Sequence, residues 1–304
     1  MTTPDLEPVA VDPAEGAPAA GPAGTGATGA GRRRRRRSPT LVIGLVLLAV
    51  VTAVALVSLV WLPYELSDTS GGRLEPPGPQ HWLGTDTLGR DLFSQTMVGT
   101  RIALTVGLGA TAVAIVIGVL VGVLAALTPP WLDDTVASAL DILIAFPTLL
   151  LAMLVVAAQG SSMWTVVLAI GIGSSAIAAR FTRILSRRVL AQQYVTAART
   201  SGTGTLGLVV RHVLPNIWPS LVVNVAVLFG VAVLAEASLS YLGLGVPPPN
   251  ASLGRLLQEA QGTVTTAPWA AIAPGLVIVA MVLGANFLAD GLRDRFDPAR
   301  RGNR

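Results

Sequence analysis

The stretch Tyr194-Val-Thr-Ala-Ala-Arg-Thr-Ser-Gly202, followed by Arg211-His-Val-Leu-Pro-Asn216, is polar and basic, whereas much of the chain around it is strongly apolar. It belongs to a connection of about 35 residues, 180–215, which is longer than the packing of two neighbouring helices requires. The order Ala-Ala, Gly and Leu-Pro predicts a helix, a turn, a second helix and a stop before the next apolar run. We therefore expect a docking surface for a partner on one side of a membrane.

The composition indicates an integral membrane protein. The 304 residues are 52% hydrophobic and only 12% charged, with a mean hydropathy of +0.65, whereas soluble domains carry about 25% charged residues. All 21 basic residues are arginine, which we attribute to genome composition. The absence of cysteine excludes disulfides and thiolate chemistry. His81 and His212 fall in loops that we place on opposite sides of the membrane, so we expect no metal site.

Six apolar segments meet the length of about 20 residues that crosses a bilayer. They predict an all-α polytopic fold with six transmembrane helices, at residues 41–62, 102–127, 135–158, 163–179, 217–235 and 269–289. Gly118 and Gly122 form a Gly-x-x-x-Gly pair, which lets helices approach closely in lipid. We favour helix packing within this chain over a dimer face for that pair.

The arginines predict the orientation of the chain. Seventeen of the 21 fall in the N-terminal tail, in 180–215 and at the C-terminus, and the other four are Arg73, Arg90, Arg101 and Arg255. Because positive charge is retained on the cytoplasmic side, both termini and 180–215 are predicted to be cytoplasmic, in a multi-pass protein of the inner or plasma membrane. The short connection that holds Asp133 and Asp134 has no arginine and is an exception.

The chain divides into three predicted parts. Residues 1–37 form a disordered cytoplasmic tail that ends in six arginines, Arg32–Arg37. We interpret these arginines as an anchor on anionic lipid, with nucleic-acid binding as the alternative. Residues 38–100 hold the first transmembrane helix and an external loop, and residues 101–300 form the transmembrane core with the connection 180–215.

The connection 180–215 resembles the signature loop of ABC-importer permeases, which runs Glu-Ala-Ala, three residues, Gly, then Leu-Pro. The residues on the positions of that signature are Ala197, Ala198, Gly202, Leu214 and Pro215. Thr196 stands where the family usually has Glu, so the acidic contact of that position is absent here.

Four further segments resemble the C-type permease of dipeptide and oligopeptide importers. They are His81-Trp-Leu-Gly-Thr-Asp-Thr-Leu-Gly-Arg-Asp91, Asp141-Ile-Leu-Ile-Ala-Phe-Pro147, Glu236-Ala-Ser-Leu-Ser-Tyr-Leu-Gly-Leu-Gly245 with Pro247–Pro249, and Phe287–Pro298. Together the resemblance extends from residue 38 to residue 300. Several motifs in the same order identify the family more specifically than one loop.

The resemblance implies a type I importer permease fold and a subunit that is not an enzyme. A phosphate-binding loop needs a lysine and the chain has none, so ATP and Mg²⁺ are expected on separate ATPase subunits, with no cofactor on this chain. The implied partners are a homologous second permease in a heterodimer, cytoplasmic ATPase subunits, an external substrate-binding protein, the peptide substrate and membrane lipid. Nucleic acid is not among them.

In this family the loop helix sits in a cleft of the ATPase and passes its motion to the spans. The residues expected to act there are Tyr194, Thr196, Ala197, Ala198, Arg199, Gly202, Arg211, His212, Leu214 and Pro215. The two alanines would permit close contact, Gly202 would end the helix or adopt a positive φ, and Pro215 would break the chain before the fifth span. The arginines and His212 would contact acidic or backbone groups of the partner; topology anchoring is the alternative for the arginines.

The candidates for the translocation pathway or its gate are Asp141, Asn224, Glu236, Ser240 and Tyr241. An acid within a span is a functional candidate, but Asp141 also fits an interfacial acid that pairs with a polar neighbour. Asn224 either lines the pathway or bonds across helices. Glu236 meets the amino terminus of a peptide, stabilises an external gate or caps the loop that follows.

A mixed-charge segment precedes the second span and is expected outside. Its candidate residues for contact with the binding protein, or for an external plug, are Gly84, Asp86, Gly89, Arg90 and Asp91. A local salt-bridged turn is the alternative, with turns at the two glycines. Residues 251–261 are predicted to form a short helix at the outer interface.

These features predict a permease subunit of an ATP-driven importer of dipeptides and oligopeptides. A permease for nickel or another small solute is the alternative within the family. A membrane scaffold with a nucleic-acid-binding tail is the alternative from another class. An intramembrane enzyme lacks support, because the spans hold no paired-carboxylate motif, cysteine or histidine.

Overall fold

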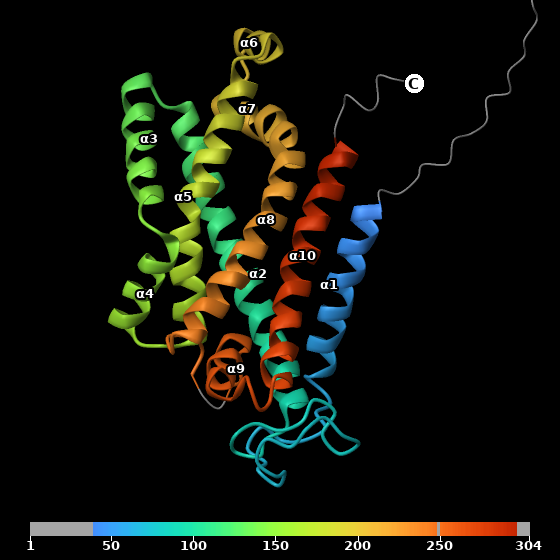
Figure 1. Ribbon diagram of the computed structural model, residues 1–304. Helices are drawn as coiled ribbons and strands as arrows, with labels where there is room; N and C mark the ends of the chain where they lie inside the picture. Colours follow the sequence, from blue (N-terminus) through green and yellow to red (C-terminus); the bar gives the residue numbers. More distant parts are fainter. Residues whose placement is uncertain (1–38, 248–249, 297–304) are drawn as a thin grey trace, which may run out of the picture. The chain divides into compact units, whose positions relative to one another are not determined.

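The computed structural model describes residues 39–247 and 250–296, which form helices and loops without a β-strand (Figure 1). The α-helices are α1 (Pro39–Val57), α2 (Leu92–Leu127), α3 (Pro130–Ala145), α4 (Thr148–Gln159), α5 (Met163–Leu190), α6 (Gln193–Thr200), α7 (Thr205–Leu208), α8 (Leu214–Tyr241), α9 (Leu253–Ala260) and α10 (Trp269–Phe296). A π-helical turn, Val209–Val213, joins α7 to α8, and a 3-10 turn, Gln261–Thr263, follows α9. The predicted tail 1–37 with its arginines, Pro248–Pro249 and the final residues 297–304 lie outside the described residues.

The prediction of an all-α protein with several spans is confirmed. Among the described residues, five helices are long and apolar enough to cross a membrane, and a sixth span results if the bent pair α3 and α4 counts as one. The five are α1, α2, α5, the continuous rod from Thr205 to Tyr241, and α10.

The third span is not the straight helix that its apolar pattern predicted. It consists of α3 and α4, which meet at an angle of 81°. Phe146, the last residue before Pro147, has an extended backbone with φ −79° and ψ 128°. A proline disfavours the helical conformation of the residue before it and cannot donate a backbone hydrogen bond. The break therefore follows from the Phe146–Pro147 step.

The second span begins at Leu92, earlier than the predicted start at Ile102. Its 36 residues correspond to about 54 Å, which exceeds the hydrocarbon thickness of about 30 Å. The start is determined by Asp91, whose side chain accepts a hydrogen bond from the backbone N–H of Ser94 at 2.7 Å. Such a cap satisfies one of the free donors at a helix N-terminus.

The connection 180–215 is mostly helix rather than loop, which corrects two expectations. The helix α5 continues to Leu190, and the rod that contains α8 already begins at Thr205. Pro215 does not break the chain before the fifth span, because the π-helical turn before it continues directly into α8. The π-helical turn before it closes with a hydrogen bond from the backbone N–H of Leu214 to the carbonyl of Val209.

Small residues bring the long helices together in two places. A side chain at Gly118 or Gly122 of α2 would collide with α5, at Ala178 and at Thr182 respectively. The interpretation of this pair as packing within the chain is confirmed. Gly44 of α1 packs equally closely on α10, because a Cβ there would lie 2.8 Å from the carbonyl oxygen of Gly284.

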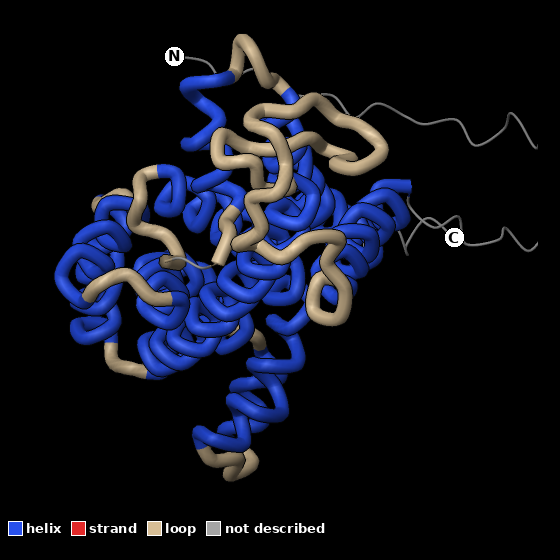
Figure 2. Tube along the Cα trace, turned by 90° about the horizontal axis from the view of Figure 1, so that it is seen from below, coloured by secondary structure: helices blue, strands red, loops and turns tan. Residues whose placement is uncertain are grey.

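The bundle of described helices has two unlike ends. One end, which we call the α6 end, carries α6, the start of α1 and the end of α10 (Figure 1). The opposite end, which we call the loop end, carries residues 58–91 and α9; the view from that side shows the long loops across it (Figure 2). Of the segments that hold most of the arginines, the described parts, 180–215 and the end of α10 with Arg293 and Arg295, lie at this α6 end (Figure 1).

Candidate functional site

The helix α6 forms the tip of the α6 end and stops at a glycine turn. Gly202 has a φ of +86°, so the prediction that it tolerates a positive φ is confirmed. Its backbone N–H donates to the carbonyl of Arg199, and that of Thr203 donates to the carbonyl of Ala198, both at 3.0 Å. This pair of bonds is a Schellman motif, which satisfies the last carbonyls of a helix.

A buried side chain and a hydrogen bond from α8 hold α6 in place. Val195 is fully buried, although its neighbours on both sides in the sequence are exposed. The amide nitrogen of Asn216 donates to the hydroxyl of Tyr194 at 2.9 Å and to the carbonyl of His212 at 2.8 Å. The rings of Tyr194 and His212 lie 5.9 Å apart. Tyr194 and His212, which were predicted to contact a partner, therefore also position α6.

The remaining predicted residues of this region form an open surface. Thr196, Ala197 and Arg199 are exposed, whereas Ala198 is half-buried. Beside them lies a shallow hollow formed by residues 201–211, with Leu206 77% exposed at its wall. Arg199 and Arg211 form no ion pair with any described residue. Leu214 instead packs beside Val213 in an apolar cluster, and Pro215 is exposed.

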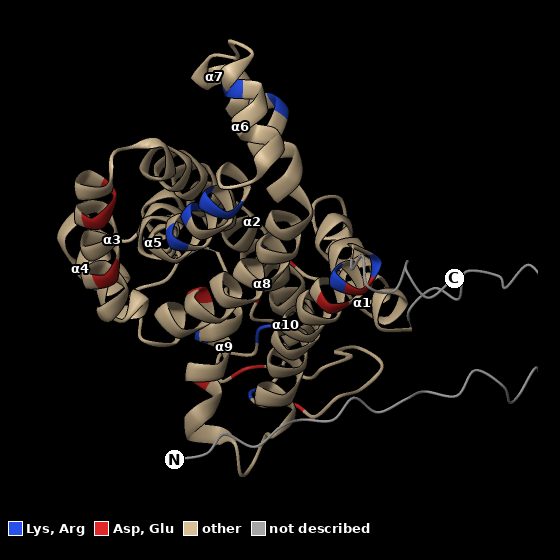
Figure 3. Ribbon diagram, turned by 90° about the horizontal axis from the view of Figure 1, so that it is seen from above, with Lys and Arg blue, Asp and Glu red and all other residues tan. Residues whose placement is uncertain are grey.

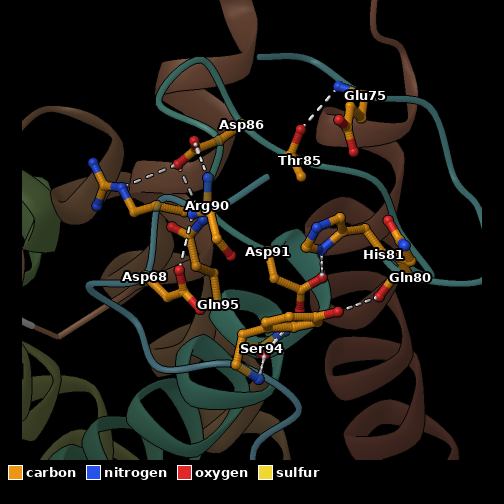
Figure 4. Close-up of polar contacts among 12 residues, drawn as sticks. Asp68, Glu75, Gln80, His81, Thr85, Asp86, Arg90, Asp91, Ser94 and Gln95 are labelled. Carbon is orange, nitrogen blue, oxygen red and sulfur yellow. Dashed lines mark hydrogen bonds and ion pairs between the residues drawn. The ribbon is translucent and has the colours of Figure 1, made fainter. Parts of the chain in front are cut away.

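The predicted external segment folds into a compact turn around the Asp86 carboxylate (Figure 4). Its Oδ1 accepts hydrogen bonds from the backbone N–H groups of Leu88 at 2.7 Å and Arg90 at 2.9 Å. Its Oδ2 accepts from the Gln95 amide at 3.1 Å and lies 3.4 Å from the Arg90 guanidinium. Gly89, with a φ of +79°, allows the chain to turn back here.

Asp91 joins this turn to α2. In addition to capping the helix, its Oδ2 accepts from the Ser94 hydroxyl at 2.8 Å, and its Oδ1 lies 3.0 Å from Nδ1 of His81. Tyr64 stacks on His81 with ring centroids 4.6 Å apart. Gly84 has a φ of +74°, and its backbone N–H donates to the carbonyl of His81. The local salt-bridged turn, one of the two predicted alternatives, is therefore present.

A small pocket separates this turn from α9. Its wall includes Leu66, Arg90, Gln95, Arg255 and Glu259. Both arginines are already paired, Arg90 with Asp86 and Arg255 with Glu259 at 2.9 Å. Nearby in the sequence, the hydrogen bonds from Ser70 lower the pKa of the Asp68 carboxyl.

The predicted helix within 251–261 is present as α9, but it is integrated into the protein. The hydroxyl of Ser252 caps it, and Leu253 and Leu256 are buried against the bundle. Gly254 contacts α8 so closely that any side chain there would collide with the carbonyl oxygen of Ala237. The helix therefore covers the ends of α8 and α10 (Figure 1).

Asp141 is paired rather than isolated. Its carboxylate lies 3.0 Å from the Arg180 guanidinium, and both side chains are more than half exposed. This is the arrangement predicted by the alternative of an acid that pairs with a polar neighbour. Asn224 is half-buried, and its Oδ1 has no hydrogen-bond partner, so the cross-helix bond that one interpretation required is not formed by the described residues.

Glu236 does not form the predicted cap of the following loop, and its roles at a gate or at a peptide amino terminus stay predictions. It is completely buried in α8, where its Oε1 accepts from the Ser240 hydroxyl at 2.7 Å and its Oε2 has no partner. Since Ser240 is one turn further along the same helix, Glu236 does not cap the loop. Tyr241 is partly exposed and donates to the Gln261 side chain at 3.1 Å. The structure does not bring these candidates together with Asp141.

Sequence reasoning missed several polar contacts. The most extensive joins Asp133 to Arg183 and Arg187, although the arginines were interpreted only as topology markers. Asn216 and Tyr64 were not singled out either. The sequence could have indicated the ion pairs of Asp133, because Arg180, Arg183 and Arg187 are spaced at three and four residues and therefore share one helix face.

Metal binding has no support in the described part of the chain, where no three His, Asp or Glu side chains gather. The two histidines lie at opposite ends, His81 in the loop-end turn and His212 beside α6.

Several membrane-length helices, one of them bent, and an exposed basic helix at one end define a multi-pass membrane transport subunit. Comparison with known proteins agrees with this class. The chain belongs to the family of binding-protein-dependent transport system inner membrane components, whose family model matches residues 114–302. Members of such systems work with a substrate-binding protein, as the name of the family states.

Several named relatives match along most of their length. The glutathione transport system permease protein GsiD of Pectobacterium atrosepticum is 42% identical over 74% of this chain and 74% of its own. A protein of Brucella suis named as a peptide permease is 37% identical over 84% of this chain and 86% of its own. The dipeptide transport system permease protein DppC of Alkalihalophilus pseudofirmus is 33% identical over 84% of this chain and 85% of its own.

Proposed function

We propose that this chain is the permease subunit of an ATP-driven importer that moves short peptides across the cytoplasmic membrane. The observation that carries the proposal is the exposed α6 surface, held in place by Val195 and by the Asn216–Tyr194 bond on a bundle of membrane-length helices. The names of three relatives, which refer to peptides, a dipeptide and glutathione, support the substrate class.

The α6 surface is proposed to receive the ATPase. Ala197 and Ala198 present little side-chain bulk, so a partner can approach the helix backbone. No acid occurs among residues 180–216, and Arg199 and Arg211 are unpaired in the described structure. Because Thr196 replaces the usual Glu, the proposed contact depends on the shape of α6 and on these arginines, which favour acidic or carbonyl groups on the ATPase.

The partners and the orientation follow from the same proposal. A homologous second permease completes the pathway, ATPase subunits bind ATP and Mg²⁺ at the cytoplasmic face, and an external binding protein delivers the peptide to the loop end. In this arrangement the chain itself performs no catalysis. The α6 end is cytoplasmic, and the Asp86–Asp91 turn faces the binding protein.

Uptake in cells tests the substrate class. A strain that lacks this gene is complemented with the wild-type chain, and the entry of a labelled dipeptide, a labelled pentapeptide and radioactive nickel is compared. Restored peptide uptake without nickel uptake is the expected result. Restored nickel uptake alone would replace the proposal with the small-solute alternative. The scaffold would be favoured if the wild-type chain restored no uptake but bound nucleic acid through Arg32–Arg37.

A further inference from the structure

Two helices at the α6 end are joined by a ladder of ion pairs. Asp133, on the first turn of α3, receives both Arg183 and Arg187 of α5, and Asp141, two turns further along α3, pairs with Arg180 at 3.0 Å. The acids of α3 and the bases of α5 lie on neighbouring helices in the view onto this end (Figure 3). The ladder runs antiparallel, since the later acid meets the earlier arginine.

The burial of the ladder makes its ion pairs energetically important. The Asp133 side chain is only 3% exposed, and Arg183 is 14% exposed. A buried carboxylate whose partners are removed is left as an uncompensated charge, which is strongly unfavourable. Asp133 also lies in the first turn of α3, where the helix dipole favours a negative charge. The outer pair, Asp141 with Arg180, is more than half exposed and contributes less.

The apolar packing of α3 is sparse by comparison. Only Asp133 and Leu140 of its 16 residues are buried, and Leu140 contacts a small cluster around Ala176 and Ala179 of α5. The second half of the same span is different, because Ala152 and Val156 of α4 are inserted in the largest apolar cluster of the bundle. The 81° bend at Phe146–Pro147 separates the firmly packed half from the loosely packed one.

We infer that Asp133 and Asp141 are positioning residues which make α3 move together with the end of α5 that leads into α6. Since α4 is packed in the core and α3 is held by the ladder, a displacement of α6 and α5 changes the bend at Pro147. The motion that the ATPase imposes on α6 thus reaches the third span through charge pairs rather than through apolar packing. This inference rests on the proposed function, in which α6 receives the ATPase.

A distance measurement tests the ladder without using transport. The chain has no cysteine, so the exposed Ser138 and Arg188 can be replaced by cysteine and spin-labelled within the complete transporter complex. We expect a narrow distance distribution between α3 and α5, with and without ATP. Asp133→Asn should broaden it, whereas Asp134→Asn, which removes an adjacent exposed acid that is in no ion pair of the described residues, should not.

Transport supplies the second readout. In proteoliposomes with the complete complex, Asp133→Asn is expected to lower the peptide transported per ATP by at least about fivefold, the lower end of typical coupling between linked sites, with Asp134→Asn equal to wild type. A role in stability alone would lower ATP hydrolysis and transport in parallel and leave their ratio unchanged. If Asp133→Asn does not fold, Asp141→Asn replaces it, and the exchange of the pair as Asp141→Arg with Arg180→Asp should restore the ratio.

The outcomes separate the two proposals. An unchanged distance distribution in both the Asp133 and the Asp141 variants would overturn the ladder, whatever the complex transports. A broadened distribution with an unchanged transport-to-ATP ratio would overturn its role in coupling. If the wild-type complex hydrolyses ATP but moves no peptide, the proposed substrate fails, while the distance measurement still decides whether α3 is bound to α5 by these charges.

Discussion

The loop end and the surface of α6 and α7 at the opposite end treat their charged groups in opposite ways. At the loop end, Asp86 and Asp91 accept hydrogen bonds from backbone and side chains within a few residues, and His81, Arg90 and Gln95 complete the network. At the α6 end, Arg199 and Arg211 have no acidic partner among the described residues, and Leu206 projects into solvent. The loop end is internally satisfied, whereas the surface of α6 and α7, unlike the paired charges of α3 and α5 at the same end, leaves groups free for a partner.

The difference separates a region whose backbone is fixed by hydrogen bonds from a surface whose charged groups are available to a partner. A buried acid that accepts three or four hydrogen bonds fixes the local backbone, and losing it leaves several donors unsatisfied. The exposed helix α6 is held by only two contacts, through Val195 and Tyr194, so a substitution on its surface removes few interactions and changes the free energy of unfolding little. We therefore expect substitutions at the loop end to change stability and substitutions at the α6 end to change coupling.

The largest effect is all-or-none and tests whether the ends lie on opposite sides of the membrane. Single cysteines are placed at Gln80 and at Thr200, which are both exposed. Because the chain has no other cysteine, a membrane-impermeant maleimide added to intact cells should label the Gln80→Cys protein only. Labelling of Thr200→Cys alone would reverse the orientation, and permeabilised cells provide the control.

A matched pair of glycines tests the turn after α6. Both Gly202 and Gly204 have free space around the position of a Cβ, but their φ angles are +86° and −67°. A β-branched residue at a positive φ costs about 1–3 kcal/mol, and about 1.4 kcal/mol corresponds to a factor of ten. Gly202→Val should therefore lower peptide uptake about tenfold in a protein that still inserts, measured against ATP hydrolysis.

Gly204→Val is the control, and we expect it to retain most of the uptake. Equal losses in both variants would show that bulk, and not backbone conformation, matters at this turn. Unchanged uptake in Gly202→Val would count against the docking role of α6.

At the loop end, Asp91→Ala should lower stability. The substitution removes a helix cap, worth about 1 kcal/mol, and leaves His81 and the Ser94 hydroxyl without a buried partner, which adds about 1–3 kcal/mol. Thermal unfolding of the purified protein in detergent would show this as a lower melting temperature. Glu65→Ala, which removes an exposed acid of the same loop, should change the unfolding free energy by less than about 0.5 kcal/mol.

The smallest effect compares one hydroxyl at each end. Tyr194→Phe removes the 2.9 Å bond from Asn216, and Tyr64→Phe removes a 3.0 Å bond to the carbonyl of Gln80. Each bond is worth about 0.5–1.5 kcal/mol, so neither variant should unfold. We expect uptake to fall only for Tyr194→Phe, because only this bond positions the coupling surface. A larger loss for Tyr64→Phe would contradict the contrast between the ends.

Local patterns predicted the parts of the fold that depend on local chemistry. The apolar runs predicted the number of spans, and the turn at Gly202 followed from its place after a short helix. The same reasoning was wrong at two prolines. Pro215 was expected to end a helix, but the π-helical turn before it lets α7 and α8 form one rod. Pro147, inside an apolar run, caused the bend that the run concealed.

The candidate site shows the same division. The residues of the α6 surface were found because they are contiguous in the sequence and unusually polar. Glu236 was predicted to contact the peptide, stabilise a gate or cap a loop because it lies near the end of a span, but its complete burial depends on the helices that pack around it. Asp133 was regarded as an exception in the charge count, since its partners lie about 50 residues away, at Arg183 and Arg187.

By itself, the sequence determined that the chain has several apolar spans and that it resembles an importer permease, and it predicted that the basic segments share one side. These properties depend on hydropathy, charge and short motifs, which act over one helix at a time. Only the tertiary structure decided the burial of Glu236 and the pairing of α3 with α5. Both depend on which helices become neighbours, and that is set by packing between distant segments.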